Sequence, residues 1–450
     1  KRLFIQGSGI HLMKTTDRQI LHIALPSIVS NITVPLLGLI DVSIVGHLGA
    51  ASYIGAIAVG GMLFNMIYWL FGFLRMGTGG LTAQAYGRHD LQESTRILLR
   101  SLSISLLLAL ALLILQFPIR SLAFTFMDTS EEVEKLATLY FHICIWGAPA
   151  TLGLYGFTGW YIGMQNSRFP MFIALTQNIV NIAASLFFVF SLGMKVEGVA
   201  LGTLVAQYAG LGMACLLWLV YYRPLRKYLH QKGLFDRTEM KRFFQVNRDI
   251  FFRTLCLIAV TVFFTSTGAA YGDVVLAVNA LLMQLFTLFS YFMDGFAYAG
   301  EALSGKYIGA RNHKALTLTV KHLFKWGISL SLLFTLLYGL GGKGFLSLLT
   351  DDATVIAASG EYIYWVLAIP LAGFSAFLLD GICIGATATR LMLRAMWIAS
   401  ASFFLLYYSL HDTLGNHALW MAFIVYLSLR GIVQGIILYR KRITDLHTLS

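Results

Sequence analysis

The chain has 450 residues, of which 58% are hydrophobic and only 12% are charged, and its mean hydropathy is +0.73. These values exclude a water-soluble domain of this size and indicate an integral membrane protein. The formal net charge of +12 is accounted for by basic loops on one side of the membrane, so it does not indicate nucleic-acid binding.

Twelve stretches are apolar and long enough to cross a membrane as α-helices, which need about 20 residues each. In the first half we expect helices at 19–46, 52–85, 95–118, 132–164, 168–193 and 197–222. In the second half we expect them at 243–268, 273–308, 316–341, 354–386, 389–410 and 416–438. Kinks are predicted at four prolines, which are Pro26, Pro35, Pro149 and Pro370. Because alternating-polarity strands are absent from the sequence, the expected fold class is an all-α membrane protein.

The longest polar stretch, YYRPLRKYLHQKGLFDRTEMKRFFQVNRD at 221–249, lies at the midpoint of the chain and indicates a linker between two halves. Five regions are predicted: a cytoplasmic N-terminal segment at 1–18, an N-lobe at 19–222, a cytoplasmic linker at 223–242, a C-lobe at 243–438, and a cytoplasmic tail at 439–450.

The two halves match one another at a single offset. GTGGLTAQAYGRHD at 77–90 aligns with AGEALSGKYIGARN at 299–312, and LYGFTGWYIGMQNSR at 154–168 aligns with AFLLDGICIGATATR at 376–390 (299 − 77 = 222 and 376 − 154 = 222). Such a repeat predicts two pseudo-symmetric lobes of six helices, related by an axis along the membrane normal.

Lysine and arginine collect in cytoplasmic loops, and here they concentrate in the N-terminal segment, the even-numbered connections and the C-terminus. Four lie on the other side of the membrane, and these are Arg120, Lys135, Lys195 and Lys343. We therefore expect both termini to be cytoplasmic. The four cysteines have no CxxC spacing, which predicts free thiols and no metal site; they are Cys144, Cys215, Cys256 and Cys383.

Asp41 stands in GLIDVSIVGHLG at 38–49, near the outer end of the first predicted helix, with no cation within a helical turn. An acid at membrane depth is a functional hypothesis by default. An apolar surround disfavours the charged form of a carboxyl group, so Asp41 could bind a proton from outside and release it inside. Its repeat partner is Phe263, which restricts this chemistry to one lobe. The alternative is that Asp41 caps the helix end and is solvated.

Polar side chains at helical spacing mark the fifth and sixth predicted helices, where they could form a network with Asp41. They are Asn178, Asn181 and Ser185 in the fifth helix and Thr203 and Gln207 in the sixth. The alternative is ordinary hydrogen bonding between helices, worth about 0.6 kcal/mol per pair.

Arg75 and Asp294 occupy nearly equivalent depths in the second and eighth predicted helices, since 294 − 222 = 72. They could pair across the lobe interface as part of a gate. The alternative is that each is satisfied within its own lobe.

Soft apolar and aromatic side chains on the same two helices could line a cavity for organic cations. The candidates are Met62, Phe64, Met66, Trp69, Met283, Phe286, Tyr291 and Met293. The alternative is that they face lipid or other helices.

Three segments resemble the multidrug and toxic compound extrusion (MATE) family, its DinF-like branch in particular: LPSIVSNITVPLLGLIDVSIVGHLG, FLRMGTGGLTAQAYGR and DGICIGATATR. The resemblance covers roughly residues 19 to 440. It implies two six-helix lobes around a V-shaped cavity. It also implies that Asp41 couples protons to substrate release, that helix 1 bends at Pro26 and Pro35, and that Asn181 and Thr203 contribute polar groups.

Two departures from the family pattern bear on coupling. Ser185 stands where many relatives carry a second aspartate, which puts a two-carboxylate relay in doubt. Sodium-linked members place acids in helices 7 and 10, and we expect no acid in the membrane-embedded parts of those helices here.

The resemblance implies a secondary active multidrug efflux transporter, not an enzyme, that exports cationic or amphipathic compounds by antiport with protons. No cofactor is expected, and sodium is disfavoured as the coupling ion. The expected partners are small organic cations or amphipathic drugs and the lipid bilayer, with no nucleic acid; we expect a monomer in the inner membrane. Two alternatives stay open: a flippase for lipid-linked oligosaccharides from the same wider superfamily, and an intramembrane enzyme.

Overall fold

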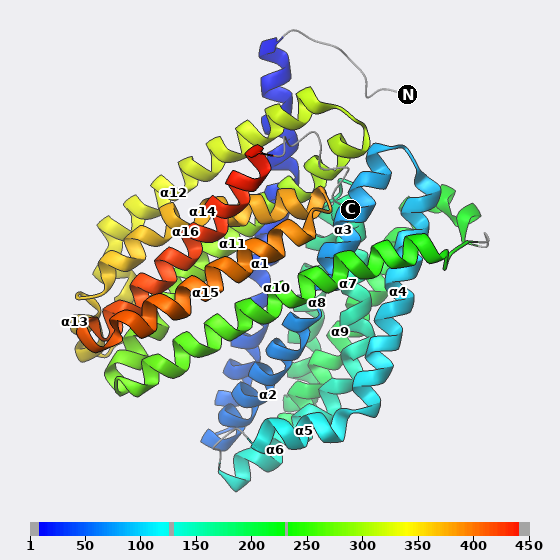
Figure 1. Cartoon of the computed structure of the whole chain (residues 1–450). Coiled ribbons are helices and arrows are strands. Elements are labelled where there is room, and N and C mark those ends of the chain that lie inside the picture. The colour runs from blue at the N-terminus through cyan, green and yellow to red at the C-terminus, as the bar shows by residue number, and fades with distance from the viewer. Residues whose placement is uncertain (1–8, 126–129, 230–232, 441–450) are drawn as a thin grey trace. The chain divides into compact units, whose positions relative to one another are not determined.

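The computed structural model describes residues 9–125, 130–229 and 233–440. Parts of four predicted regions lie outside the described residues: 1–8 of the N-terminal segment, 126–129 of the N-lobe, 230–232 of the linker and 441–450 of the tail. Throughout the described ranges the regular structure is helical and no strand is formed (Figure 1). The predicted all-α fold class is therefore confirmed.

The first half contains α1 (Gly9–Gly46), α2 (Ala51–Leu70), α3 (Phe73–Gly87), α4 (Leu91–Ile114), α5 (Gln116–Thr125), α6 (Glu131–Cys144), α7 (Ala148–Gly163), α8 (Arg168–Leu186) and α9 (Val196–Tyr221). The second half contains α10 (Arg237–Ala270), α11 (Asp273–Gly309), α12 (His313–Leu349), α13 (Ala353–Ser359), α14 (Ile363–Gly385), α15 (Thr389–Leu414) and α16 (Asn416–Arg440).

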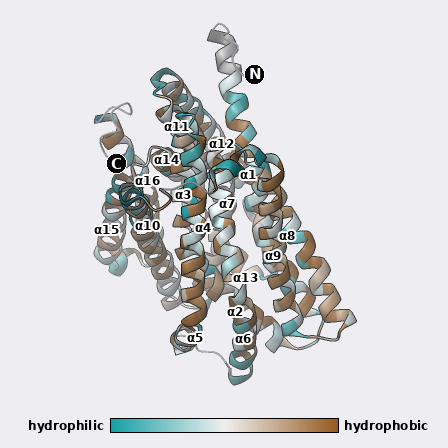
Figure 2. Ribbon diagram, turned by 90° about the vertical axis from the view of Figure 1, so that its right-hand side faces the viewer, coloured by the Kyte–Doolittle hydropathy of each residue, from teal (hydrophilic) through white to brown (hydrophobic). Residues whose placement is uncertain are grey.

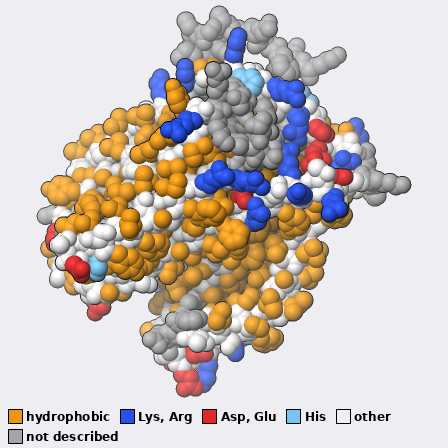
Figure 3. Space-filling model, in the orientation of Figure 1, with side chains coloured by type: hydrophobic (Ala, Val, Ile, Leu, Met, Phe, Trp, Pro, Cys, Tyr) orange, Lys and Arg blue, Asp and Glu red, His pale blue; other side chains and the backbone are white. Residues whose placement is uncertain are grey.

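Twelve helical segments of the described chain are long and apolar enough to span a membrane, which confirms the predicted number. Hydrophobic residues run along the helices and hydrophilic residues gather toward their ends (Figure 2). The visible surface carries broad areas of apolar side chains, as contact with lipid requires (Figure 3). The chain is a multi-pass membrane protein.

Some predicted spans consist of two helices in the structure. The predicted span 52–85 is broken between α2 and α3, where the backbone N–H groups of Phe71 and Gly72 bond to carbonyls three residues earlier. In the span 132–164 a 3-10 turn at Ile145–Gly147 separates α6 from α7, and Pro149 lies in the first turn of α7, where its missing N–H costs no helical bond. By contrast, α1 runs unbroken through Pro26 and Pro35.

The chain forms two compact units. The N-terminal unit runs from Pro26 to Phe243, and the C-terminal unit comprises the part of α1 up to Leu25 together with the residues from Phe244 onward. The division falls inside α1 and inside α10, so these unit borders differ from the predicted lobes 19–222 and 243–438. In the structure the first helix starts in one unit and carries Asp41 in the other.

The repeat is visible in the backbone at the same offset. Asp90 caps the N-terminus of α4 by accepting a hydrogen bond from the N–H of Glu93. Asn312 caps α12 by accepting one from Ala315, and 312 − 90 = 222. The preceding residues, His89 and Arg311, both have left-handed backbone angles, with φ of 59° and 53°, as do Gln165 and Thr387, with φ of 66° and 54°.

Matched glycines let pairs of helices pack backbone to backbone inside each unit. A Cβ atom on Gly159 of α7 would collide with the carbonyl oxygen of Arg75 in α3. A Cβ atom on Gly381 of α14 would collide with the carbonyl oxygen of Ala297 in α11, and 297 − 75 = 222. The glycines four residues later repeat this contact, Gly163 against Gly79 and Gly385 against Glu301. Both units thus contain the same glycine-dependent helix crossing.

Candidate functional site

Asp41 lies in α1 and is only 4% exposed, which argues against a solvated helix cap. Its Oδ2 atom accepts a hydrogen bond of 3.1 Å from the hydroxyl of Thr203 in α9. Its Oδ1 atom is buried and has no hydrogen-bond partner among the residues the structure describes. A buried carboxylate with one oxygen unsatisfied is costly to keep charged, so the site can take up a proton.

Thr203 connects Asp41 to two side chains of α8. The amide of Asn181 donates to the Thr203 hydroxyl at 3.4 Å, and the hydroxyl of Ser185 donates to the Asn181 carbonyl oxygen at 3.0 Å. A Cβ atom on Gly202 would collide with Ser185, so this glycine lets α8 and α9 approach closely. The structure therefore brings four of the predicted polar residues into one chain of hydrogen bonds.

Two other predicted members of the network are placed differently. Asn178 donates through its amide nitrogen to the carbonyl oxygen of Ala174 in its own helix, at 2.8 Å. Gln207 packs against Gly147, where a Cβ atom would collide with its side-chain oxygen, and that oxygen has no hydrogen-bond partner among the described residues. Among the described residues, Asn178 and Gln207 are therefore not part of the series of hydrogen bonds that links Ser185, Asn181 and Thr203 to Asp41.

Tyr140 and Cys144 of α6 also belong to the surroundings of Asp41, with which both interact electrostatically. They are 5% and 2% exposed. Sequence reasoning did not include them in the site. Their spacing of four places them on one face of a helix, but nothing in the sequence indicates that this face meets Asp41.

The residues predicted to line a cavity divide into exposed and buried side chains. Met62, Met66 and Trp69 of α2 are 48%, 42% and 41% exposed. Phe64 is instead buried and stacks on the ring of Phe141. The ring of Phe64 belongs to an aromatic core, which favours the alternative that this side chain faces other helices.

On α11, one of the four predicted cavity residues is fully buried. Met293 has no exposed surface, which favours the alternative that it faces other helices. Phe286 is partly buried and packs edge-on against Phe423. Met283 and Tyr291 are partly exposed.

Arg75 and Asp294 belong to different units, and their pairing stays a prediction. Inside its own unit Asp294 interacts electrostatically with Arg430 of α16 and with Tyr291. That environment favours the alternative in which Asp294 is satisfied within its lobe.

A second buried acid, Asp380 of α14, was not anticipated from the sequence. It accepts hydrogen bonds from Arg253 of α10, from Arg430 at 2.7 Å and from the amide of Gln434 at 2.6 Å. It is 6% exposed, and both arginines are also buried. The apolar run FLLDGICIG around Asp380 resembles the surround of Asp41 and was the signal that could have identified it.

Buried acids are thus present in α10 and α14, which correspond to the predicted helices 7 and 10. Asp249 of α10 is 2% exposed and accepts hydrogen bonds of 3.1 Å from both Arg248 and the hydroxyl of Thr389. Asp249 and Asp380 are tolerated because arginines and hydrogen bonds compensate their charge. The four cysteines are free thiols, as predicted. No cluster of His, Cys, Asp and Glu suited to a metal is formed by the described residues.

Comparison with known proteins gives consistent results over nearly the whole chain. The sequence matches the MatE protein family over residues 26–187 and 250–408. It is 38% identical to the DNA damage-inducible protein F of Escherichia coli K12, over 96% of this chain and 94% of that protein.

Two solved structures share the fold. A MATE crystal structure in a bent conformation aligns with a TM-score of 0.85 at 20% identity, covering 99% of both chains. An outward-facing multidrug resistance MATE transporter aligns with a TM-score of 0.81 at 21% identity, covering 99% of this chain and all of the other.

Proposed function

The chain belongs to the MatE family, and on this premise we propose that it is a secondary active multidrug efflux transporter that exchanges cationic or amphipathic organic compounds for protons. The family and the DinF-like relationship expected from the sequence are confirmed. Because the family's members are transporters, the intramembrane-enzyme alternative is set aside.

The burial of Asp41 is the observation that carries the proposal. Its carboxylate is enclosed in the N-terminal unit, with one oxygen hydrogen-bonded to Thr203 and the other without a partner among the described residues. A group in this environment binds a proton readily when the external solution reaches it. When ionised, it attracts a cation.

Coupling follows from competition between proton and cargo. With Asp41 ionised the protein takes up a lipophilic cation, and protonation from outside neutralises the site and expels the cargo. A ligand can shift such an equilibrium only through its different affinities for the two states. We infer that α1 bends at Pro26 and Pro35 during this step, since proline removes a helical hydrogen bond at each position.

The polar groups of the C-terminal unit favour protons over sodium as the coupling ion. Hard cations are bound by several oxygen ligands, whereas the carboxylate of Asp380 already accepts hydrogen bonds from two arginines and one amide. The distribution of lysine and arginine supports an orientation with both termini in the cytoplasm.

Everted vesicles holding a proton gradient test the proposal. Proton efflux is followed when a panel of lipophilic cations is added, with and without sodium, for the wild type, Asp41→Asn and the exposed control Asp273→Asn. We expect sodium-independent efflux that is lost only in Asp41→Asn. If no cation causes proton efflux from vesicles that contain folded wild-type protein, the alternative of a flippase for lipid-linked oligosaccharides is favoured.

A further inference from the structure

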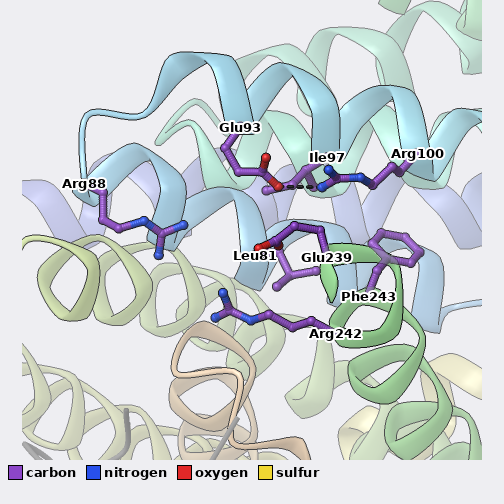
Figure 4. A pocket seen from close by; sticks show the side chains of 8 residues that line it. All are labelled: Leu81, Arg88, Glu93, Ile97, Arg100, Glu239, Arg242 and Phe243. Atoms are coloured by element: carbon purple, nitrogen blue, oxygen red, sulfur yellow. Dashed lines mark hydrogen bonds and ion pairs between the residues drawn. The ribbon is translucent and has the colours of Figure 1, made fainter. Parts of the chain in front are cut away.

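A small pocket lined by three arginines lies in the N-terminal unit, away from Asp41. We call it the arginine pocket. Its lining comes from α3, from the start of α4, from the connection between these two helices, and from the first turns of α10 (Figure 4). The lining residues are Leu81, Arg88, Glu93, Ile97, Arg100, Glu239, Arg242 and Phe243. None of them takes part in the proposed proton coupling.

Arg100 is the most deeply buried charge of the arginine pocket, at 1% exposure. Its Nε donates to the carbonyl oxygen of Leu234 at 2.6 Å, and its Nη1 pairs with the carboxylate of Glu93. Its Nη2 is buried and has no hydrogen-bond partner among the described residues. A guanidinium donor left unpaired in this way retains an unfilled capacity to bind an anion.

Arg242 adds a second unpaired donor. Its Nη2 donates to the side-chain oxygen of Gln84 at 2.9 Å, while its buried Nε has no hydrogen-bond partner within the described ranges. Arg242 and Arg88 repel one another electrostatically across the pocket. The three arginines face two carboxylates, those of Glu93 and Glu239, so the lining carries a net positive charge.

We propose that the arginine pocket binds a phosphate-type oxyanion, either the headgroup of an anionic phospholipid or free phosphate. Guanidinium groups match the oxygens of phosphate in geometry and charge, and basic pockets at the cytoplasmic ends of membrane helices suit lipid headgroups. The enclosed volume is about 10 Å³, room for roughly one water-sized atom. One oxygen of the phosphate enters beside Arg100 and Arg242, and the rest of the group stays at the mouth beside the exposed Arg88.

The bound oxyanion would join α10 to α3 and α4. Glu239, Arg242 and Phe243 come from the first turns of α10, whereas Arg100 comes from α4 and Leu81 from α3. By satisfying donors on more than one helix it would hold the start of α10 in place. The site is a structural or regulatory one, independent of the exported compound and of the proposed function.

The test measures the melting temperature of the purified full-length protein in nanodiscs. One arm titrates inorganic phosphate into protein in phosphatidylcholine, and the other replaces part of that lipid with phosphatidylglycerol. Stabilisation by phosphate in the neutral lipid identifies free phosphate as the ligand. Stabilisation by phosphatidylglycerol alone identifies the headgroup. Absence of stabilisation in both arms overturns the proposal.

Variants decide whether the ligand sits in the arginine pocket. Arg88→Gln and Arg242→Gln should each raise the concentration for half-maximal stabilisation by about tenfold, the effect of losing one charged hydrogen bond. Arg223→Gln is the matched control, since it removes an exposed charge outside the pocket. Arg88 is exposed, so Arg88→Gln tests the proposal even if Arg242→Gln fails to fold. Unchanged binding in Arg88→Gln, or an equal loss in Arg223→Gln, overturns it.

Discussion

The hydroxyl of Thr203 donates a hydrogen bond to the carboxylate of Asp41, and this bond joins α9 to α1. The same hydroxyl accepts from the amide of Asn181. Because a hydroxyl has a single proton to donate, the direction of the chain is fixed from α8 through Thr203 to the acid. A change in the charge of Asp41 therefore alters the strength of the hydrogen bond that Thr203 donates to it.

Asp41→Asn should uncouple transport from pH. In the wild type, lowering the external pH protonates Asp41, so the affinity for a lipophilic cation should fall as the pH drops. The amide of asparagine does not titrate in this range, so cation binding by the variant should be independent of pH between about 5 and 8. Buried carboxyl groups can titrate within this range. Equilibrium binding of a fluorescent cation measures the affinity at each pH. A wild-type affinity that does not change with pH would contradict the coupling mechanism.

Thr203→Val should slow proton-coupled efflux several-fold while leaving the fold intact. Valine keeps the shape of threonine but removes the donor to Asp41 and the acceptor for Asn181, interactions worth about 0.5–1.5 kcal/mol each. Thr203→Ser should retain most of the rate. Thr265→Val is the control, because within the described part of the chain that hydroxyl donates to its own helix, at the carbonyl oxygen of Thr261. Equal rates in Thr203→Val and Thr265→Val would contradict the proposed role of the hydrogen bond.

Asp380→Asn should destabilise the protein by about 3–5 kcal/mol, the usual effect of removing one partner from a buried ion pair. Arg253 and Arg430 would then lie close together in the C-terminal unit without their shared counter-charge. Thermal unfolding of the purified protein measures the loss. Asp412→Asn is the control, because that side chain is 87% exposed.

Combining Asp380→Asn with Arg430→Gln should recover part of the lost stability, because the double variant removes one of the two uncompensated cations. If Asp380→Asn melts at the temperature of the wild type, the ion cluster makes no contribution to stability.

Gly159→Ala and Gly381→Ala should destabilise by similar amounts, roughly 1–3 kcal/mol each, the range for overpacking. In both cases the added methyl group meets a backbone carbonyl, which cannot move like a flexible side chain. Gly212→Ala should be neutral or slightly stabilising, because a Cβ atom there meets nothing within 4 Å. Melting temperatures compare the three variants. A large difference between Gly159→Ala and Gly381→Ala would show that the two crossings are not equivalent.

The helices and the repeat could be predicted because they depend on local patterns. Long apolar runs identify twelve spans. Two glycine pairs that align at the offset of 222, Gly159 with Gly381 and Gly163 with Gly385, permit close helix crossings. The breaks could not be predicted in the same way. The apolar run passes through Gly72 without a change in hydrophobicity, so composition carries no sign that α2 ends at Leu70.

The candidate site was predictable only where a polar residue stands out against an apolar background. Asp41, Asn181, Ser185 and Thr203 satisfy that condition, and the structure joins them by hydrogen bonds. Tyr140 does not, because tyrosine is common in membrane helices and its partner is remote in sequence. Gln207 also stands out as polar, and its spacing from Thr203 alone does not show that it lies outside the hydrogen-bond network of Asp41.

The shared glycine crossings also constrain how the two halves could have diverged after a gene duplication. An ancestral half-length protein that used this crossing would pass the same glycines to both copies, and a larger residue at Gly159 or Gly381 would damage whichever copy acquired it. Positions away from the crossing carry no such constraint. Asp41 and Phe263 occupy equivalent positions in the two halves. Both halves have therefore kept the glycine crossing, whereas only the first half carries the acid.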